Sequence, residues 1–190
     1  MKPSIFVKYV LPFIQWYALL ILIAIGIDYL LHRFHLVLVG RYLGFIGTSV
    51  ILLSFIYSLR KRKIIESGSP KKLLLLHEYL AWGGSLMLLV HAGIHFSAQL
   101  PWLAVYMMLI AVASGLVGKF LLKRATDSLK ERKQDLLSQG ISSDDAEKKL
   151  FFDSLTVDLM KKWRVVHLPI TIVFAILALL HILTILMFSK

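Results

Sequence analysis

Five long apolar segments limit what this chain can fold into. Their approximate bounds are residues 9–31, 38–59, 73–97, 101–122 and 165–188. A helix needs about 20 apolar residues to cross the hydrocarbon core of a bilayer, and each segment reaches that length. Inside lipid every backbone polar group must be satisfied within the chain, which favours helices for these spans. With 58% hydrophobic residues, above the roughly 45–50% typical of soluble domains, we expect an all-α integral membrane bundle of five transmembrane helices.

The segment 123–164, between the fourth and fifth spans, breaks the apolar pattern. It interleaves bases with most of the acids of the chain: Asp127, Glu131, Asp135, Asp144, Asp145, Glu147, Asp153 and Asp158. Leucines recur at helical spacing before Gly140, a residue type that commonly ends helices, and Ser142 or Ser143 can cap a new helix. We therefore expect a helical hairpin between spans four and five, whose apolar stripe either packs internally or docks a partner.

Basic residues set the expected orientation of the chain. The N-terminus, the 60–72 loop and the 123–164 segment fall on one side of a five-span bundle and hold nearly all the Lys and Arg, which predicts that this side is cytoplasmic. The formal net charge of +11 is then explained by topology and anionic lipid rather than by nucleic acid. The first span shows no small-residue cleavage site, so we expect it to stay as an anchor in a bacterial inner membrane.

Two spans carry a matched pair of histidines each. His77 and His91 lie in the third span, His167 and His181 in the fifth, and both pairs are fourteen residues apart. On a helix this spacing is a rotation of about 1400°, roughly 40° short of four turns, and a rise of roughly 21 Å. Two such helices side by side and pointing the same way would bring the four rings together as two facing pairs. Strongly polar side chains inside a bilayer are costly and mark functional sites.

Two facing pairs of imidazoles suit two bis-histidine haems, because neutral imidazole is a standard ligand of haem iron. The chain has no cysteine, so a thioether attachment is excluded and the cofactors are expected to be two haem b. The alternatives are a proton path and histidines bonded to neighbouring helices. His95 faces the same way as His77, so the choice between His91 and His95 stays open. With His32 and His35, His95 could also bond a propionate, line a quinone site or lie at the membrane surface.

Small residues accompany the histidines. The second span carries a stripe of glycines that lets helices approach closely, and Gly115 in the fourth span is interpreted in the same way; the stripe is Gly40, Gly44 and Gly47. Gly83 and Gly84 lie midway between His77 and His91, where the backbone could approach either a porphyrin or another helix. Arg41, at the start of the second span, is placed to reach a lipid phosphate or a haem propionate.

These features resemble the ferric-reductase-like transmembrane domain family. It includes the membrane parts of ferric-chelate reductases and NADPH oxidases and the haem-binding membrane subunit of the bacterial methionine sulfoxide reductase system. The resemblance rests on the paired histidines, on Gly40-Arg-Tyr-Leu-Gly44 and on Trp163-Arg164, and covers roughly residues 38–122 and 160–188. It implies an inner haem shared by His77 and His167 and an outer haem shared by His91 and His181. His95, Arg41 and Arg164 are secondary candidates.

The chain also departs from that family. It has no sixth span, the loop between spans four and five is unusually long, and no flavin or nicotinamide domain or Gly-rich nucleotide fingerprint is present. Residues 1–190 are thus expected to form one di-haem membrane domain, whose reductase activity would require a partner. The expected function is electron transfer across the bilayer between a cytoplasmic donor or quinol and an outer acceptor, with redox partner subunits docking on 123–164. The alternative is a non-catalytic membrane anchor of a respiratory complex.

Overall fold

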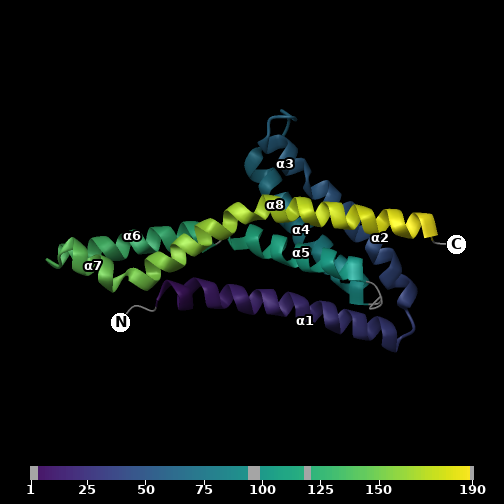
Figure 1. The fold of residues 1–190 in the computed structure, drawn as a ribbon, viewed down its shortest axis with the longest axis horizontal. Coiled ribbons are helices and arrows are strands. Elements are labelled where there is room, and N and C mark those ends of the chain that lie inside the picture. The colour runs from purple at the N-terminus through teal and green to yellow at the C-terminus, as the bar shows by residue number, and fades with distance from the viewer. Residues whose placement is uncertain (1–3, 94–98, 118–120, 189–190) are drawn as a thin grey trace.

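The computed structural model describes residues 4–93, 99–117 and 121–188, apart from the side chain of Arg164. These residues form helices and connecting turns (Figure 1), in the order η1 (Phe6–Val10), α1 (Leu11–Arg33), α2 (Val37–Ser54), α3 (Ile56–Lys61), α4 (Pro70–Gly93), α5 (Gln99–Leu116), α6 (Leu122–Ser138), α7 (Ser143–Lys149) and α8 (Phe151–Phe188). Five stretches are long and apolar enough to cross a membrane: Phe6–Arg33, Val37–Lys61, Pro70–Gly93, Gln99–Leu116 and Phe151–Phe188. The predicted all-α class is confirmed for the described residues, and five helices have the length and apolar composition that the predicted spans require.

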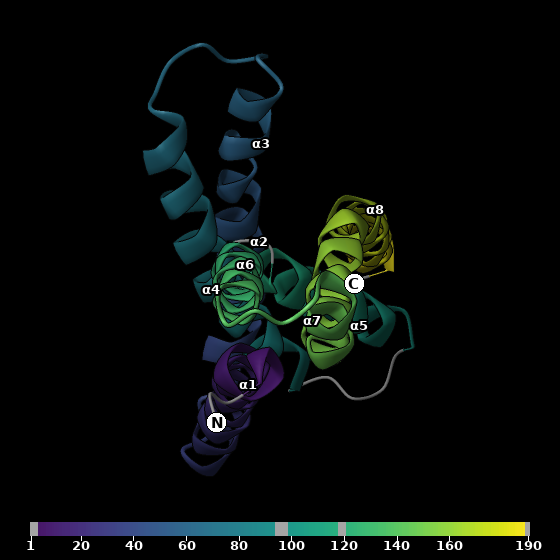
Figure 2. The same cartoon turned by 90° about the vertical axis from the view of Figure 1, so that its left-hand side faces the viewer.

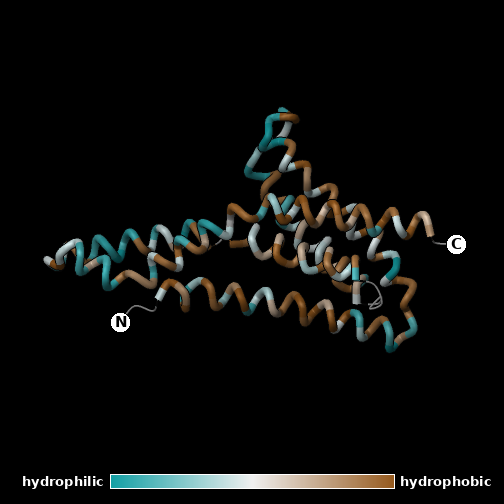
Figure 3. The backbone as a smooth tube through the Cα atoms, viewed as in Figure 1, coloured by the Kyte–Doolittle hydropathy of each residue, from teal (hydrophilic) through white to brown (hydrophobic). Residues whose placement is uncertain are grey.

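Two spans differ from simple straight helices of membrane length. The second is interrupted at Phe55, between α2 and α3. The Ser54 hydroxyl donates to the Ile51 carbonyl at 2.7 Å, and the Phe55 N–H bonds to Leu52 instead. Such competition from a serine hydroxyl bends helices. The fifth span belongs to a 38-residue helix, about 57 Å long, and Figure 3 shows its hydrophilic first part and apolar remainder.

The most extensive packing between helices lies within two pairs, α2 with α4 and α5 with α8. Glycines bring the first pair together, because a Cβ on Gly84 would lie 2.6 Å from the Ile51 side chain and 3.1 Å from the Gly47 carbonyl. Gly84 therefore serves helix approach, whereas a Cβ on Gly83 would meet nothing within 4 Å. In the second pair, Phe174 packs on α5. Figure 2 shows α3 and α4 on one side and α8 on the other.

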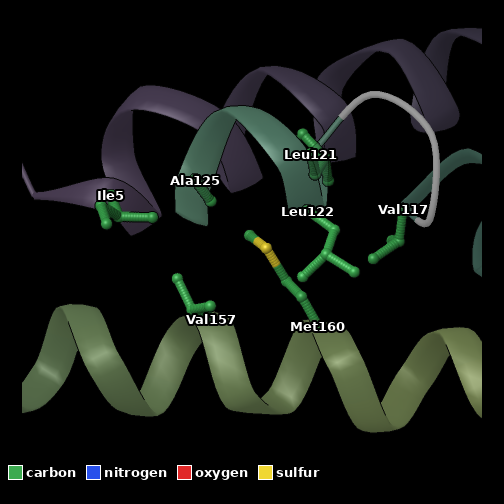
Figure 4. Packing of buried hydrophobic residues seen from close by; sticks show 7 residues of the cluster. All are labelled: Ile5, Val117, Leu121, Leu122, Ala125, Val157 and Met160. Carbon is green, nitrogen blue, oxygen red and sulfur yellow. The ribbon is translucent and has the colours of Figure 1, made fainter. Parts of the chain in front are cut away.

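Helix α6 packs against the first part of α8, and α7 joins them. Gly140, with φ +80°, follows α6, and the Ser142 hydroxyl accepts the Asp145 N–H at the start of α7. Buried apolar residues between α6, α8 and the N-terminal helix form a cluster (Figure 4): Ile5, Val117, Leu121, Leu122, Ala125, Val157 and Met160.

A buried ion pair fastens this cluster. Asp153 pairs with Arg132 at 2.7 Å and accepts the Ile5 N–H at 2.8 Å. One carboxylate of α8 thus holds both α6 and the N-terminal segment. The connector between α1 and α2 and the C-terminal end of α8 both lie at the end of the molecule opposite α7 (Figure 1).

Candidate haem-binding site

The four histidines singled out by their spacing lie on the two helices expected from the sequence, His77 and His91 on α4 and His167 and His181 on α8. All four side chains are half-buried rather than exposed. Within the described residues, α4 and α8 make little direct backbone contact, and each packs mainly on its own partner helix.

His91 lies in a cradle formed by α2. Its Nδ1 is 3.1 Å from the carbonyl oxygen of Gly40, and its ring lies directly over Gly44. A Cβ built on Gly44 would come within 2.7 Å of Cε1 and 2.8 Å of both ring nitrogens. Only glycine leaves room for the ring at this point. Gly44 therefore serves the histidine itself, beyond the general close approach of helices predicted from the glycine stripe.

His167 has a cradle of the same design on α5. Its Nδ1 is 3.0 Å from the carbonyl oxygen of Ala111, and a Cβ on Gly115 would lie 3.2 Å from its Cε1. In both cradles the carbonyl and the glycine are four residues apart, at 40 and 44 and at 111 and 115, one turn of helix. The interpretation of Gly115 as simple helix packing was therefore incomplete, because the ring of His167 fills the space.

His77 is held at the break in the second span. Its Nδ1 is 2.9 Å from the carbonyl oxygen of Ser54, the last residue of α2, and its ring lies 5.5 Å from that of Tyr57. The acceptors of the two α4 histidines, Gly40 and Ser54, are fourteen residues apart, as are His77 and His91. The antiparallel packing of α2 on α4 thus presents a carbonyl to each ring in register.

These contacts decide which nitrogen of each ring carries the proton. A carbonyl oxygen only accepts, so Nδ1 of His77, His91 and His167 must be the donor. In the neutral imidazole Nε2 then keeps its lone pair. Metal-bound histidines generally donate their other N–H to a carbonyl or carboxylate, which fixes the ring and raises its basicity. In three of the four candidate ligands the tautomer is therefore the one that a metal ligand through Nε2 would have.

The secondary candidates are less defined. Arg41 is exposed on α2, next to Gly40. His95 and the side chain of Arg164 lie outside the described residues. His32 and His35 are exposed near the α1–α2 connector, where His32 Nδ1 bonds to the Asp28 carbonyl oxygen at 2.9 Å. The choice between His91 and His95 stays a prediction, although His91 has the cradle just described.

A bare metal ion and a bis-histidine haem require different sets of protein ligands. The described residues contain no group of three or more His, Cys, Asp or Glu side chains able to hold an ion, whereas haem requires only two axial imidazoles. Two cavities, of about 350 and 260 Å³, lie at α6–α7–α8 and between η1 and α6, and no histidine lines either. The fit therefore rests on the oriented rings.

Comparison with known proteins adds no identity. No family model, no curated protein and no solved structure matches the chain. The resemblance to the ferric-reductase-like family stays a prediction based on the histidine pairs and the short motifs around them.

Proposed function

We propose that this protein is a di-haem membrane cytochrome b that carries electrons across the bilayer as a subunit of a redox complex. The observation that carries the proposal is the set of three Nδ1–carbonyl hydrogen bonds, at 2.9, 3.1 and 3.0 Å, on histidines in two membrane spans. Histidines kept only for helix packing have no need of a shared tautomer. Three rings that all present Nε2 as the free nitrogen meet the requirement of a haem ligand.

In the proposed arrangement His77 and His167 hold one haem, and His91 and His181 hold the other. The equal spacing of fourteen residues between the two histidines on α4 and the two on α8 supports this pairing. The haems supply one-electron redox chemistry when bound. The task of this chain is to fix four rings, to keep the surroundings apolar and to separate the two ligand levels by roughly 21 Å along each helix. The two pairs of histidines would then lie at two depths in the membrane.

The polar segments give the proposed topology. The N-terminus, the α3–α4 turn and the α6–α7 segment carry most of the Lys and Arg, so we assign them to the cytoplasmic side of a bacterial inner membrane. His77 and His167 then belong to the inner haem. The helical hairpin formed by α6, α7 and the start of α8 is the proposed dock for a redox partner, because Phe152 and Leu159 expose 77% and 57% of their surface there. Quinol is the alternative electron donor.

Absorption spectroscopy of the purified protein tests the proposal. We expect about two haems per chain, with reduced-minus-oxidised bands of the b type. His91→Ala or His181→Ala should remove one haem, and His77→Ala or His167→Ala the other. The exposed His32 provides the matched control, since His32→Ala should keep both.

The competing function is a non-catalytic anchor of a respiratory complex, in which the histidines serve structure. A protein that folds in membranes, co-purifies with partner subunits and contains no haem after haem-replete expression would establish the anchor. If the cytochrome proposal holds instead, redox titration should give two midpoint potentials.

A further inference from the structure

Ser114 adds a second hydrogen-bonding group to the environment of His167. Its side chain is fully buried on α5. The hydroxyl oxygen lies 2.8 Å from Nδ1 of His167 and also 2.8 Å from the carbonyl oxygen of Ala111. The same Nδ1 is 3.0 Å from that carbonyl. The three atoms therefore form a closed triangle of hydrogen-bonding groups beneath the ring.

Only one placement of the protons satisfies all three hydrogen-bonding groups. The Ala111 carbonyl can only accept, and the hydroxyl has one proton to give. If Ser114 donated to Nδ1, that nitrogen would present a lone pair to the Ala111 oxygen, and two acceptors would face each other at 3.0 Å. With the proton on Nδ1, the ring donates to both oxygens and the hydroxyl donates to Ala111. Every group is then satisfied.

We propose that Ser114 is a positioning residue that lowers the midpoint potential of the haem bound by His167. This inference rests on the proposed cytochrome function. A second acceptor on Nδ1–H draws the proton further from the ring, which makes Nε2 more electron-rich. A more basic axial ligand stabilises ferric over ferrous iron, and hydrogen bonding around the ligands is one of the means by which proteins set haem potentials. At His77, the ring proposed to share this haem, the Ser54 carbonyl is the acceptor.

Redox titration of Ser114→Ala tests the inference. Removal of the hydroxyl leaves the Ala111 carbonyl on Nδ1, so we expect two haems per chain with one midpoint potential shifted upward and the other unchanged. The low-spin electron paramagnetic resonance signal of the same haem should shift as well, since it depends on ligand basicity. Ser114→Thr keeps a hydroxyl and should restore the wild-type potential.

Ser85→Ala is the matched control. Ser85 is a buried serine of the other histidine-bearing helix pair, 1% exposed, and its hydroxyl has no hydrogen-bond partner within the described residues. This variant should leave both potentials unchanged, which separates the hydrogen bond to His167 from the mere loss of a buried hydroxyl.

The outcomes are distinct. If Ser114→Ala keeps two haems with both potentials as in the wild type, the inference is wrong while the cytochrome proposal stands. If Ser114→Ala loses one haem and Ser114→Thr regains it with its potential, the hydroxyl is still the deciding group. Loss in both variants would refute a role for the hydroxyl, and a wild-type protein without haem would overturn the proposed function together with this inference.

Discussion

A methyl group added at Gly44 should abolish one haem site and leave the other. The Cβ of Gly44→Ala would lie 2.7 Å from Cε1 of His91, whereas ordinary contact begins at 3.4 Å. The ring must therefore retreat by at least about 0.7 Å (3.4 − 2.7), well beyond the roughly ±0.2 Å within which metal–ligand distances hold. The same movement works against the 3.1 Å hydrogen bond from Nδ1 to Gly40. All three close contacts of this Cβ are with ring atoms of His91.

Haem content per chain is the assay. Gly44→Ala should fall from two haems to one, and redox titration should show the loss of a single potential. Gly26→Ala is the control, because its Cβ meets nothing within 4 Å and α1 carries none of the four candidate ligands. Gly47→Ala tests helix packing, since its Cβ would lie 3.0 Å from the Met87 Cβ and 3.1 Å from the Gly84 carbonyl. It should lower thermal stability without removing one haem selectively. Two haems with wild-type spectra in Gly44→Ala would refute the reasoning.

Gly115→Ala extends the test to the second cradle with a graded result. Its Cβ would lie 3.2 Å from Cε1 and 3.5 Å from Nδ1 of His167, so the ring needs to give by only a few tenths of an ångström. We expect the haem at His167 to stay bound with a shifted spectrum and weaker retention on dilution. A loss as complete as that in Gly44→Ala would show that the size of the clash does not decide binding.

Three further predictions concern the polar end of the molecule. Asp153→Asn removes the charge that faces the part-buried Arg132 and should cost up to roughly 3 kcal/mol. The expected result is a lower thermal midpoint, with release of the N-terminal segment to proteases. Gly140→Ala should cost about 1 kcal/mol, because a residue with a Cβ is strained at φ +80°; denaturant unfolding measures this. A hydrogen bond from Lys133 lowers the pKa of Glu147, so the stabilisation from this pair is present above the ordinary pKa of 4.5 and lost as pH falls through the lowered pKa. Since the pair is exposed, Glu147→Gln should lower the thermal midpoint only slightly at pH 7, and the difference from the wild type should shrink as Glu147 is protonated at acidic pH.

The apolar helices, and the placement of two histidines on each of two helices, were predictable because both are periodic features of one helix. Spacing fixes which residues share a face, and apolar length fixes what crosses a bilayer. The end of α6 at Gly140 and the Ser142 cap were predicted for similar reasons, since both depend on a few adjacent residues. These predictions needed no knowledge of which helix lies beside which.

The cradles could not be predicted, because they depend on pairs of helices. Gly44 and Gly115 look like any small residue of a membrane helix until a neighbouring ring is placed over them. Every residue has a carbonyl, so nothing in the sequence distinguishes that of Gly40 as an acceptor. A usable signal was present in two serines within apolar spans, Ser54 and Ser114. The hydroxyl of each bonds to a carbonyl of its own helix. The carbonyl of Ser54 and the hydroxyl of Ser114 also contact a histidine.

The distribution of helix contacts also bears on how the protein holds together. Helix α4 packs chiefly on α2, and α8 on α5, with α4 touching α5 between the pairs. Each proposed haem would be bound by one histidine from each pair. Helices in lipid lack the hydrophobic drive that packs soluble proteins, so association depends on close contact and specific bonds. Ligation across the two pairs would then be a main source of cohesion between them. Ligand binding stabilises the state that binds it, so haem-free protein should show weaker protection of α8 than of the α2–α4 interface in hydrogen exchange. Equal protection with and without haem would mean that the helices associate independently of the cofactor.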